Sequence, residues 1–373
     1  MEIQFNDLSK QWEIIEDTVV PRLDKLFKKS DFIGGEAIRE FEKNFAKYCG
    51  TKYAIGCSNG TDALKLCLSA FELRSPCGII IPANTFIATA LAVTYLSDLN
   101  YEIILIDCDD YYQIDTDLLE TYLKNNRNKW KDCVIIPVHL FGHPADMERI
   151  IEIADEFNCL ILEDSSQAHG ALVLNKKVGC LGDTSAFSLY PGKNLGAAGD
   201  AGIITTNNEE LYEKIRALRN YGSRKKYHYD FKGWNNRMDT IQAIILNEKL
   251  KYLDKWNDMR IEVAGQYNEQ LRDNKDLITP KSASYIDKQV YHIYAIRLKN
   301  RDEFQSYLLK NGIPTIIHYP IPIQRTEPFK HLDIFNNKKT LKFAEELLSL
   351  PIYPFLTDEE IEYITSSIIG FFD

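Results

Sequence analysis

The sequence lacks several features that would assign it at once to a common class of protein. No two of its eight cysteines, at positions 49, 57, 67, 77, 108, 133, 159 and 180, are spaced as CxxC. Neither a zinc centre nor a dithiol redox motif is therefore indicated. Because most of these cysteines fall within apolar runs, we expect buried thiols in a reducing compartment, the cytoplasm. No Gly-x-Gly-x-x-Gly turn follows the first β-like run, which argues against a nicotinamide-dependent dehydrogenase.

Long apolar runs and an excess of positive charge are also missing. The apolar runs are broken by Pro, Asn, Asp or Lys well before the roughly 18 residues that a membrane helix needs, so we expect no transmembrane segment. The opening stretch, MEIQFNDLSKQWEIIEDTVVP, is acidic and amphipathic, unlike a signal peptide. The 373 residues include 44 Lys and Arg against 54 Asp and Glu, a net charge of −10. That balance argues against broad binding to nucleic acid or membranes, but it leaves room for a local basic pocket.

What the sequence does contain, up to about residue 205, is an alternation of β-like runs and helical segments. The β-like runs begin at Tyr53, Gly78, Glu102, Cys133, Cys159, Thr184 and Ala201, and helical spacing is found at 8–30, 36–48, 63–70, 85–96, 115–125 and 145–157. The alternation predicts a mostly parallel α/β sheet covered by helices on both faces. Ligands of such sheets gather where the strands end.

The pattern changes after residue 206. A helix is expected at 211–219, a long helical region at 238–272, an antiparallel strand at 290–298, a β-like run at 315–318, and further helices at 301–311, 338–348 and 358–371. We expect a large domain, residues 1–250, that includes the N-terminal helices, and a smaller C-terminal α+β domain, residues 251–373.

Three segments carry candidate chemistry, and the first is the turn Ser58-Asn-Gly-Thr-Asp between a β-like run and a helix. Backbone N–H groups at a helix N-terminus attract phosphate, and Gly60 and Thr61 add close approach and a hydroxyl donor. The alternative is a plain helix cap by Ser58, Asn59 or Thr61, which needs no ligand.

The other two segments present a carboxylate and an amine. The run that begins at Cys159 leads into Asp164, which needs a cationic or hydrogen-bonding partner at that sheet edge unless it only caps a helix. Lys193 lies in SAFSLYPGKNLGAAGD, a small-residue loop between two β-like runs. Desolvation there would lower its pKa and make the neutral amine a Schiff-base nucleophile, whereas the alternative is an ordinary solvated lysine.

Pyridoxal phosphate requires the four kinds of group that the chain presents in order. It needs phosphate anchors, an aromatic side chain against the ring, a carboxylate that keeps the pyridine nitrogen protonated, and a lysine for its aldehyde. The phosphate-type turn is at 58–62, an aromatic follows a strand at 84–87, and Asp164 and Lys193 come later.

Read together, these motifs closely resemble those of the sugar aminotransferases of the DegT/DnrJ/EryC1/StrS family. The resemblance covers essentially the whole chain and is carried by FIGGEAIREFEKNFAKYCG, YAIGCSNGTDAL, PANTFIATA, VHLFGHPADM, EDSSQAHGA, FSLYPGKNLGAAGDAG, LRNYGS, GWNNRMDTIQA and IIHYPIPI. It implies the type I aspartate-aminotransferase fold, with a mostly parallel seven-stranded sheet in the large domain, and a pyridoxal-phosphate-dependent transaminase.

The resemblance also implies roles for individual residues. Lys193 would form the Schiff base with the cofactor and later move the substrate proton, and Asp164 would pair with the pyridine nitrogen. Gln167 would lie beside the ring and its phenolic oxygen, and Phe86 would stack on the ring.

At the phosphate end, the resemblance implies that Gly60, Thr61 and Ser188 hold the phosphate group. Asn235 would reach the phosphate of the neighbouring subunit's cofactor, so the functional unit would be a homodimer with shared active sites. Of the histidines, His139, His143 and His169 are expected to be structural or near the cofactor. His169 is the best candidate to lie near the cofactor.

The implied substrates are an amino acid, by family habit L-glutamate, and a keto sugar linked to a nucleotide. A nucleotide diphosphate needs cations, and basic residues beside aromatics suit both phosphate pairing and stacking. The loop that follows residue 218 offers Arg219, Tyr221, Arg224, Lys225, Lys226, Tyr227, Tyr229 and Lys232. The alternative is a solvated charged loop without a partner.

The site of amination is suggested by finer motifs. YPGKNLGAAGDAG together with NYGS, KYH and HYPIPI resembles enzymes acting on dTDP-3-keto-6-deoxyhexoses more than the 4-keto group, which implies a 3-amino sugar for glycan or antigen biosynthesis such as lipopolysaccharide. His318 is then a candidate sugar contact, or else a strand histidine satisfied locally. Gln324 stands where many relatives have histidine, which leaves a 4-keto acceptor open.

Two further alternatives remain within the same fold. A family dehydratase keeps the cofactor but lacks the lysine, so Lys193 argues against it. A non-catalytic binding module is the other, and the intact set of Asp164, Gln167 and Lys193 argues against that.

Overall fold

The structure is a computed structural model that describes residues 1–332, 334–335 and 338–372. In this part of the chain the central sheet has eight strands in the order β1-β9-β8-β5-β4-β2-β3-β12. They are β1 (Tyr53–Cys57), β9 (Gly202–Thr206), β8 (Thr184–Ser188), β5 (Leu160–Asp164), β4 (Asp132–Ile135), β2 (Cys77–Pro82), β3 (Tyr101–Ile106) and β12 (Ile334–Phe335). Among these strands β9 runs opposite to all the others, so its pairs with β1 and β8 are antiparallel. The expected mostly parallel seven-stranded sheet is confirmed, and the two-residue strand β12 is added beside β3.

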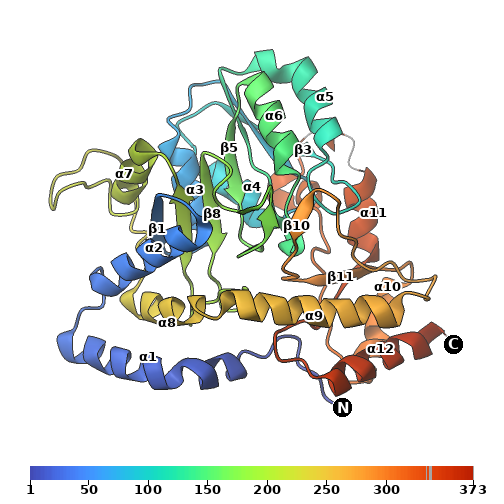
Figure 1. Cartoon of the computed structure of the whole chain (residues 1–373). Coiled ribbons are helices and arrows are strands. Elements are labelled where there is room, and N and C mark those ends of the chain that lie inside the picture. Colours follow the sequence, from blue (N-terminus) through green and yellow to red (C-terminus); the bar gives the residue numbers. More distant parts are fainter. Residues whose placement is uncertain (333, 336–337, 373) are drawn as a thin grey trace.

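Helices cover both faces of this sheet because alternate residues of each strand point to opposite sides (Figure 1). Ile79 and Ile81 of β2 belong to the core under α3 (Gly60–Ala70), α4 (Ile87–Thr94) and α7 (Glu209–Leu218). Ile80, between them, belongs to the core under α5 (Thr116–Asn126) and α6 (Met147–Phe157). The strand therefore reads as a continuous apolar run, as expected for a sheet buried on both faces.

The N-terminal helices α1 (Ser9–Lys29) and α2 (Glu36–Cys49) pack on α8 (Thr240–Leu250). Figure 1 shows α8 followed closely by α9 (Leu253–Leu271), so the long helical region expected at 238–272 is two helices with a break at 251–252. The residues of α9 pack into the C-terminal core, whereas those of α8 pack against α1 and the central sheet. The division into domains 1–250 and 251–373 stays a prediction, and its boundary falls at this break.

The C-terminal region contains α10 (Arg301–Lys310), α11 (Lys338–Glu346), α12 (Asp358–Phe372) and the antiparallel pair β11 (Tyr294–Arg297) and β13 (Leu347–Leu350). A small sheet is formed by β10 (Ile286–Lys288), β6 (Leu172–Val173) and β7 (Lys176–Lys177). Short 3₁₀ turns lie at η1 (Arg127–Lys129), η2 (Leu140–Gly142), η3 (Ile323–Arg325) and η4 (Glu327–Phe329). None of the helices in the described part of the chain combines the length and the apolar character needed to cross a lipid bilayer.

Two expectations for this region are wrong in detail. The helix expected at 338–348 ends at Glu346, because Leu347 to Leu350 are buried and pair with β11. The run 315–318 forms no strand, and only Ile316 makes a bridge, to Ser349.

The first residues of the chain join the C-terminal core rather than the large sheet. Ile3 is buried in that core, and its N–H donates to the Gly312 carbonyl at 3.0 Å. The segment that follows, Phe5 and Asn6, is thereby held against the cavity described next.

Candidate active site

A cavity of about 860 Å³ opens where the parallel strands of the central sheet end. Its lining residues follow β1, β2, β5 and β8, which explains how segments far apart in the sequence meet. Eight of the residues singled out in the sequence lie there: Gly60, Thr61, Phe86, Asp164, Gln167, Ser188, Lys193 and His318.

Lys193 lines the cavity from the loop between β8 and β9. The loop is fixed by backbone hydrogen bonds from Lys193 N to the Tyr190 carbonyl and from Ala197 N to the Leu189 carbonyl, both 2.8 Å. Burial lowers the pKa of the Lys193 amine to about 8, and the Asp164 carboxylate acts in the opposite direction. A useful fraction of the amine is therefore neutral and nucleophilic near neutral pH.

Asp164 ends β5 and is held in place by two donors. The Thr89 hydroxyl donates to Oδ2 at 3.0 Å, and the Ser166 N–H donates to Oδ1 at 3.2 Å. The second bond is a local turn of the kind that the capping alternative predicts, whereas the first comes from α4. The carboxylate thus faces the cavity in a fixed orientation, with lone pairs left for a donor there.

The preceding residue, Glu163, points to the opposite side of β5 and serves the structure instead. Its carboxylate accepts from Gly179 N at 2.8 Å and from Leu181 N and Gly182 N at 2.9 Å, and it pairs with His139 Nε2 at 3.1 Å. Burial by itself raises the pKa of Glu163, but the His139 ring and the backbone N–H groups outweigh it and lower the pKa. His139 therefore has the structural role expected of it.

The turn before α3 combines a helix cap with a bare backbone. Asn59 is the cap, since its side chain accepts from Asp62 N at 2.8 Å. A Cβ added to Gly60 would lie 2.6 Å from the Ser188 Cβ, so only glycine allows the turn to pack on the end of β8. The helix cap therefore occurs together with a turn at Gly60 and Thr61 that lines the cavity.

Gln167 connects three segments around the cavity. Its amide oxygen accepts from Phe141 N at 2.7 Å, and its Nε2 donates to the Tyr319 hydroxyl at 3.0 Å. The Tyr319 ring in turn lies 5.2 Å from the Phe86 ring, centroid to centroid. These contacts place two aromatic rings and an amide along one wall of the cavity.

His318 lines the cavity and is also satisfied locally, because its Nδ1 lies 2.8 Å from the Ser349 hydroxyl. Burial and the nearby Lys193 lower the pKa of His318 to about 4, so the ring is neutral at physiological pH. Gln324 lies in η3, is buried, and does not line the cavity.

The two other histidines singled out in the sequence lie outside the cavity lining. His143 accepts from Ala283 N at 3.2 Å and stacks on Tyr111, a structural arrangement. His169 is buried with its ring 5.3 Å from that of Phe187, and burial together with the Lys193 amine lowers its pKa to about 3. It is near Lys193, but it does not reach the cavity surface.

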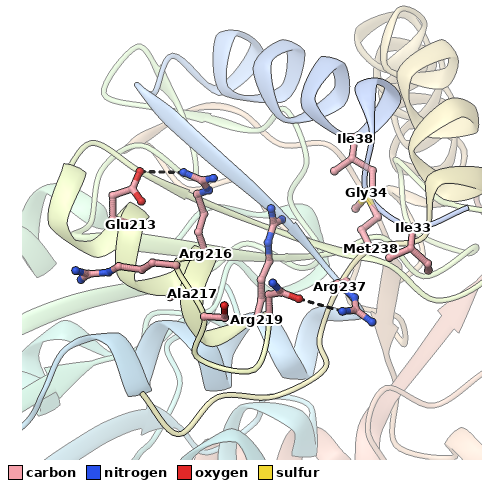
Figure 2. Close-up of a pocket in the computed structure, with 12 residues that line it drawn as sticks. Ile33, Gly34, Ile38, Glu213, Arg216, Ala217, Arg219, Arg237 and Met238 are labelled. Carbon is pink, nitrogen blue, oxygen red and sulfur yellow. Dashed lines mark hydrogen bonds and ion pairs between the residues drawn. The ribbon is translucent and has the colours of Figure 1, made fainter. Parts of the chain in front are cut away.

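The basic and aromatic loop after α7 lies away from this cavity. Arg219 faces a second cavity of about 380 Å³, where Arg216 and Arg237 also lie (Figure 2). Arg224 lines the same cavity. There Arg219 pairs with Glu42 at 2.5 Å, and Arg237 donates to the Asn220 side chain at 3.0 Å. Four residues expected to bind substrate are exposed on the loop: Tyr221, Lys225, Lys226 and Tyr227.

Asn235 is exposed and also lies outside the larger cavity. Its neighbour Asn236 is buried and donates to the Ser58 hydroxyl at 3.1 Å and to Asp62 at 2.5 Å. The segment that carries Asn235 is therefore fixed to the back of the turn before α3.

Several residues of the site are missing from the sequence-based set. Tyr319 lies in the segment IIHYPIPI and Thr89 in PANTFIATA. Both segments support the family resemblance, but the sequence did not indicate a role for either residue. His292, held by Asn194 Oδ1 at 3.0 Å, and the N-terminal pair Phe5 and Asn6 carried no signal in the sequence, because only tertiary packing brings them to the cavity.

The residues present fit pyridoxal phosphate. The bare backbone at Gly60 beside Ser188 and Thr61 suits a phosphate group. The oriented Asp164 carboxylate suits a protonated pyridine nitrogen, and the partly neutral Lys193 amine suits an aldehyde.

Comparisons with known proteins agree with this fit. A model of the DegT/DnrJ/EryC1/StrS aminotransferase family matches residues 13–369. The chain is 39% identical over 368 residues to the dTDP-3-amino-3,6-dideoxy-alpha-D-galactopyranose transaminase of Aneurinibacillus thermoaerophilus, with 98% of each chain covered. It is 38% identical over 364 residues to the UDP-N-acetyl-3-dehydro-alpha-D-glucosamine 3-aminotransferase of Acidithiobacillus ferrooxidans, with 97% of this chain and 96% of the relative covered.

A solved structure gives the same answer for the fold. The crystal structure of Streptomyces venezuelae DesV in complex with a ketimine intermediate superposes with a TM-score of 0.93 at 34% identity, covering 99% of this chain and 98% of DesV. The type I fold expected from the sequence is confirmed over the whole length.

Proposed function

Since this chain belongs to the DegT/DnrJ/EryC1/StrS aminotransferase family, we propose that it transfers the amino group of L-glutamate to the 3-keto group of a dTDP-linked 6-deoxyhexose. The chain is a pyridoxal-phosphate-dependent enzyme that aminates nucleotide-linked sugars. The observation that carries the proposal is the partly neutral Lys193 amine in one cavity with the oriented Asp164 carboxylate.

The names of the two relatives support carbon 3 as the position of amination. One is a dTDP-3-amino sugar transaminase and the other a 3-aminotransferase of a UDP sugar. The dTDP relative, at 39% identity over 98% of both chains, supports the dTDP-linked acceptor. The product would be a 3-amino sugar for a glycan or antigen such as lipopolysaccharide.

The cofactor, when bound, supplies an aldehyde that accepts the amino group and a ring that delocalises the electron pair left at Cα. In our proposal Asp164 keeps a proton on the pyridine nitrogen, and Thr89 keeps Asp164 oriented. The Lys193 amine removes the proton from Cα of the amino acid and returns protons to the amino sugar.

The remaining residues of the cavity position the reactants. Phe86 and Gln167 hold the ring from the wall they share with Tyr319. Gly60, Thr61 and Ser188 bind the phosphate, and the neutral His318 ring contacts the sugar.

We further propose that the enzyme is a homodimer in which each copy completes the other's active site. Asn235 and the loop residues Arg219, Tyr221, Lys225, Lys226 and Tyr227 lie outside the cavity of their own chain. Asn235 and most of the loop are exposed, which supports a role in the partner subunit's active site. There Asn235 binds the phosphate of the cofactor, and the loop binds the diphosphate of the nucleotide sugar.

The test is a direct assay of the pure enzyme. It is incubated with L-glutamate and a panel of 3-keto and 4-keto sugars linked to dTDP, UDP or GDP, and the products are identified by mass spectrometry and NMR. We expect a 3-amino sugar from the dTDP-linked 3-keto-6-deoxyhexose at the highest kcat/KM. A preferred 4-amino product overturns the regiochemistry, and no amino sugar from any acceptor overturns the aminotransferase.

A further inference from the structure

Two thiols lie side by side at the end of the central sheet opposite the cavity. Val134 of β4 is paired with Leu160 of β5, so the preceding residues, Cys133 and Cys159, stand opposite each other at the amino ends of these parallel strands. Each thiol is the largest influence on the pKa of the other, which places the two sulfur atoms next to each other. The Cys159 Sγ also donates to the Phe157 carbonyl at 3.7 Å. Cys133 is buried, whereas Cys159 is partly exposed.

A fixed positive charge lies next to Cys159. The Arg127 guanidinium donates to the Phe157 carbonyl at 2.7 Å and to the Asn158 carbonyl at 3.0 Å, the two residues just before Cys159. It also donates to the carbonyls of Trp130 at 2.7 Å and Lys131 at 3.4 Å. These acceptors are neutral, and among the described residues no ion pair involves Arg127, so its charge is available to an anion at Cys159.

The other charged and thiol groups nearby are committed elsewhere. Asp132, next to Cys133, is bound by Arg74 through both carboxylate oxygens, Oδ2 at 3.1 Å and Oδ1 at 2.6 Å. Cys77 pairs with Asp132 in the β-ladder, one residue out of step with Cys133, so its side chain points to the other face of the sheet. The pair of Cys133 and Cys159 with Arg127 is therefore a distinct cluster.

The electrostatic environment separates Cys159 from the other thiols. The hydrogen bond with Cys133 lowers the pKa of the Cys159 thiol, burial opposes this, and Arg127 adds to the lowering. Cys180 is also partly exposed, but burial and the Glu163 carboxylate raise its pKa to about 11. The pKa is therefore lowered at Cys159 and raised at Cys180, although both thiols are partly exposed.

We propose that Cys159 is the most reactive thiol of this protein, and that hydrogen peroxide links it to Cys133 in a reversible intrachain disulfide. The Cys159 thiolate attacks the peroxide oxygen, the O–O bond breaks, and a sulfenic acid and hydroxide are formed. The Cys133 sulfur then attacks the Cys159 sulfur, the S–S bond forms, and the hydroxyl leaves as water with the thiol proton. One peroxide is reduced by the electrons of two thiols.

The register of the two strands is compatible with this bond. Adjacent strands lie about 4.7–4.9 Å apart, within the range of about 4.4–6.8 Å seen for the Cα atoms of disulfide-bonded cysteines. Neither cysteine lines the cavity, so the reaction is separate from transamination.

The first experiment measures thiol reactivity in the holoenzyme. The folded protein is treated briefly with iodoacetamide near pH 7, and each cysteine peptide is quantified by mass spectrometry. We expect Cys159 to be alkylated on the order of tenfold or more faster than Cys180, the matched control. R127M should slow alkylation of Cys159 and leave Cys180 unchanged. Equal rates for the two thiols, or no effect in a folded R127M, overturn the proposal.

The second experiment tests the disulfide. Limited hydrogen peroxide should yield a cross-linked Cys133–Cys159 peptide that dithiothreitol reverses. C159S should abolish it, and C133S should stop at a Cys159 sulfenic acid that dimedone traps. A wild-type protein in which another thiol is oxidised first, or in which Cys159 is oxidised without a cross-link, contradicts the proposal. Both serine variants should keep the transaminase activity.

Discussion

The amine of Lys193 and the carboxylate of Asp164 owe their chemistry to different causes. Burial in the cavity lowers the pKa of Lys193 to about 8, and Asp164 only opposes that effect. Asp164 is instead defined by its donors, one from a distant helix and one from its own turn. One residue is tuned by desolvation and the other by orientation.

The pKa of Lys193 predicts how the apoenzyme takes up its cofactor. Only the neutral amine attacks an aldehyde, so below a pH of about 8 the uptake rate should rise about tenfold per pH unit and then level off. Absorbance of the bound cofactor after mixing, followed from pH 6 to 10, measures it. A rate that climbs without levelling up to about pH 10 would show a lysine with its ordinary pKa. K193R is the control and should show no covalent uptake.

The Thr89 hydroxyl gives a second prediction at the scale of single residues. A hydrogen bond to a charged group contributes about 1.5–3 kcal/mol, so T89V should lower kcat by on the order of tenfold or more by releasing Asp164. T94V removes a hydroxyl from the end of the same helix, where it donates to the Leu91 carbonyl, and should leave kcat unchanged. Steady-state kinetics of both variants decide, and equal values for the two would remove Thr89 from the proposed mechanism.

Sequence reasoning found the residues of the cavity that stand next to strand ends, because chain order and alternation locate those ends. Gly60, Asp164 and Lys193 are of this kind. It missed His292 and Asn6, whose positions depend on packing between remote segments. It also did not foresee that the loop from Arg219 to Tyr227 lies outside the cavity of its own chain.

At the scale of elements, the turn between β1 and α3 requires its glycine, Gly60, whereas the glycine in α9, Gly265, can be replaced by alanine. In G60A the new Cβ would meet Ser188 at 2.6 Å, and such overpacking costs about 1–3 kcal/mol. We expect a lower melting temperature and weaker cofactor binding. G265A, in α9, meets no atom within 4 Å and should gain about 0.5–1 kcal/mol of stability. Thermal unfolding and cofactor titration measure both, and a G60A enzyme with unchanged cofactor affinity would contradict the phosphate assignment.

The elements themselves were largely predictable where the local pattern and the tertiary environment agree. The strands of the large sheet are apolar runs of the right length, and helices such as α5 and α6 begin after an aspartate that caps them, Asp115 and Asp146. The pattern failed at Leu347 to Leu350, where an apolar run next to a helix becomes a strand only because β11 offers a free edge. The sequence pattern also joined α8 to α9 into one helical region, because neither glycine nor proline stands at the break at residue 251.

At the scale of the whole molecule, the proposed shared site predicts complementation between an inactive variant and one with weakened cofactor binding. N235A should weaken cofactor binding, and K193A should be inactive. If Asn235 acts on the partner's cofactor, a mixed dimer of the two variants contains one site with both defects and one intact site. Activity should therefore reappear when the two variants are unfolded and refolded together, or when their subunits exchange. A mixture that stays inactive, with mixed dimers shown by mass spectrometry, would place Asn235 in its own chain's site.

The attachment of the N-terminal segment to the C-terminal core has a consequence for synthesis on the ribosome. Asn6 and Gly60 leave the ribosome early, yet the cavity they line also needs His318, Tyr319 and Ile352. Ile3 itself packs on a core that includes residues up to Ile368. Ile3 is thus translated long before its packing partners, so the nascent chain offers no complete site for the cofactor until the segment through Ile352 has emerged.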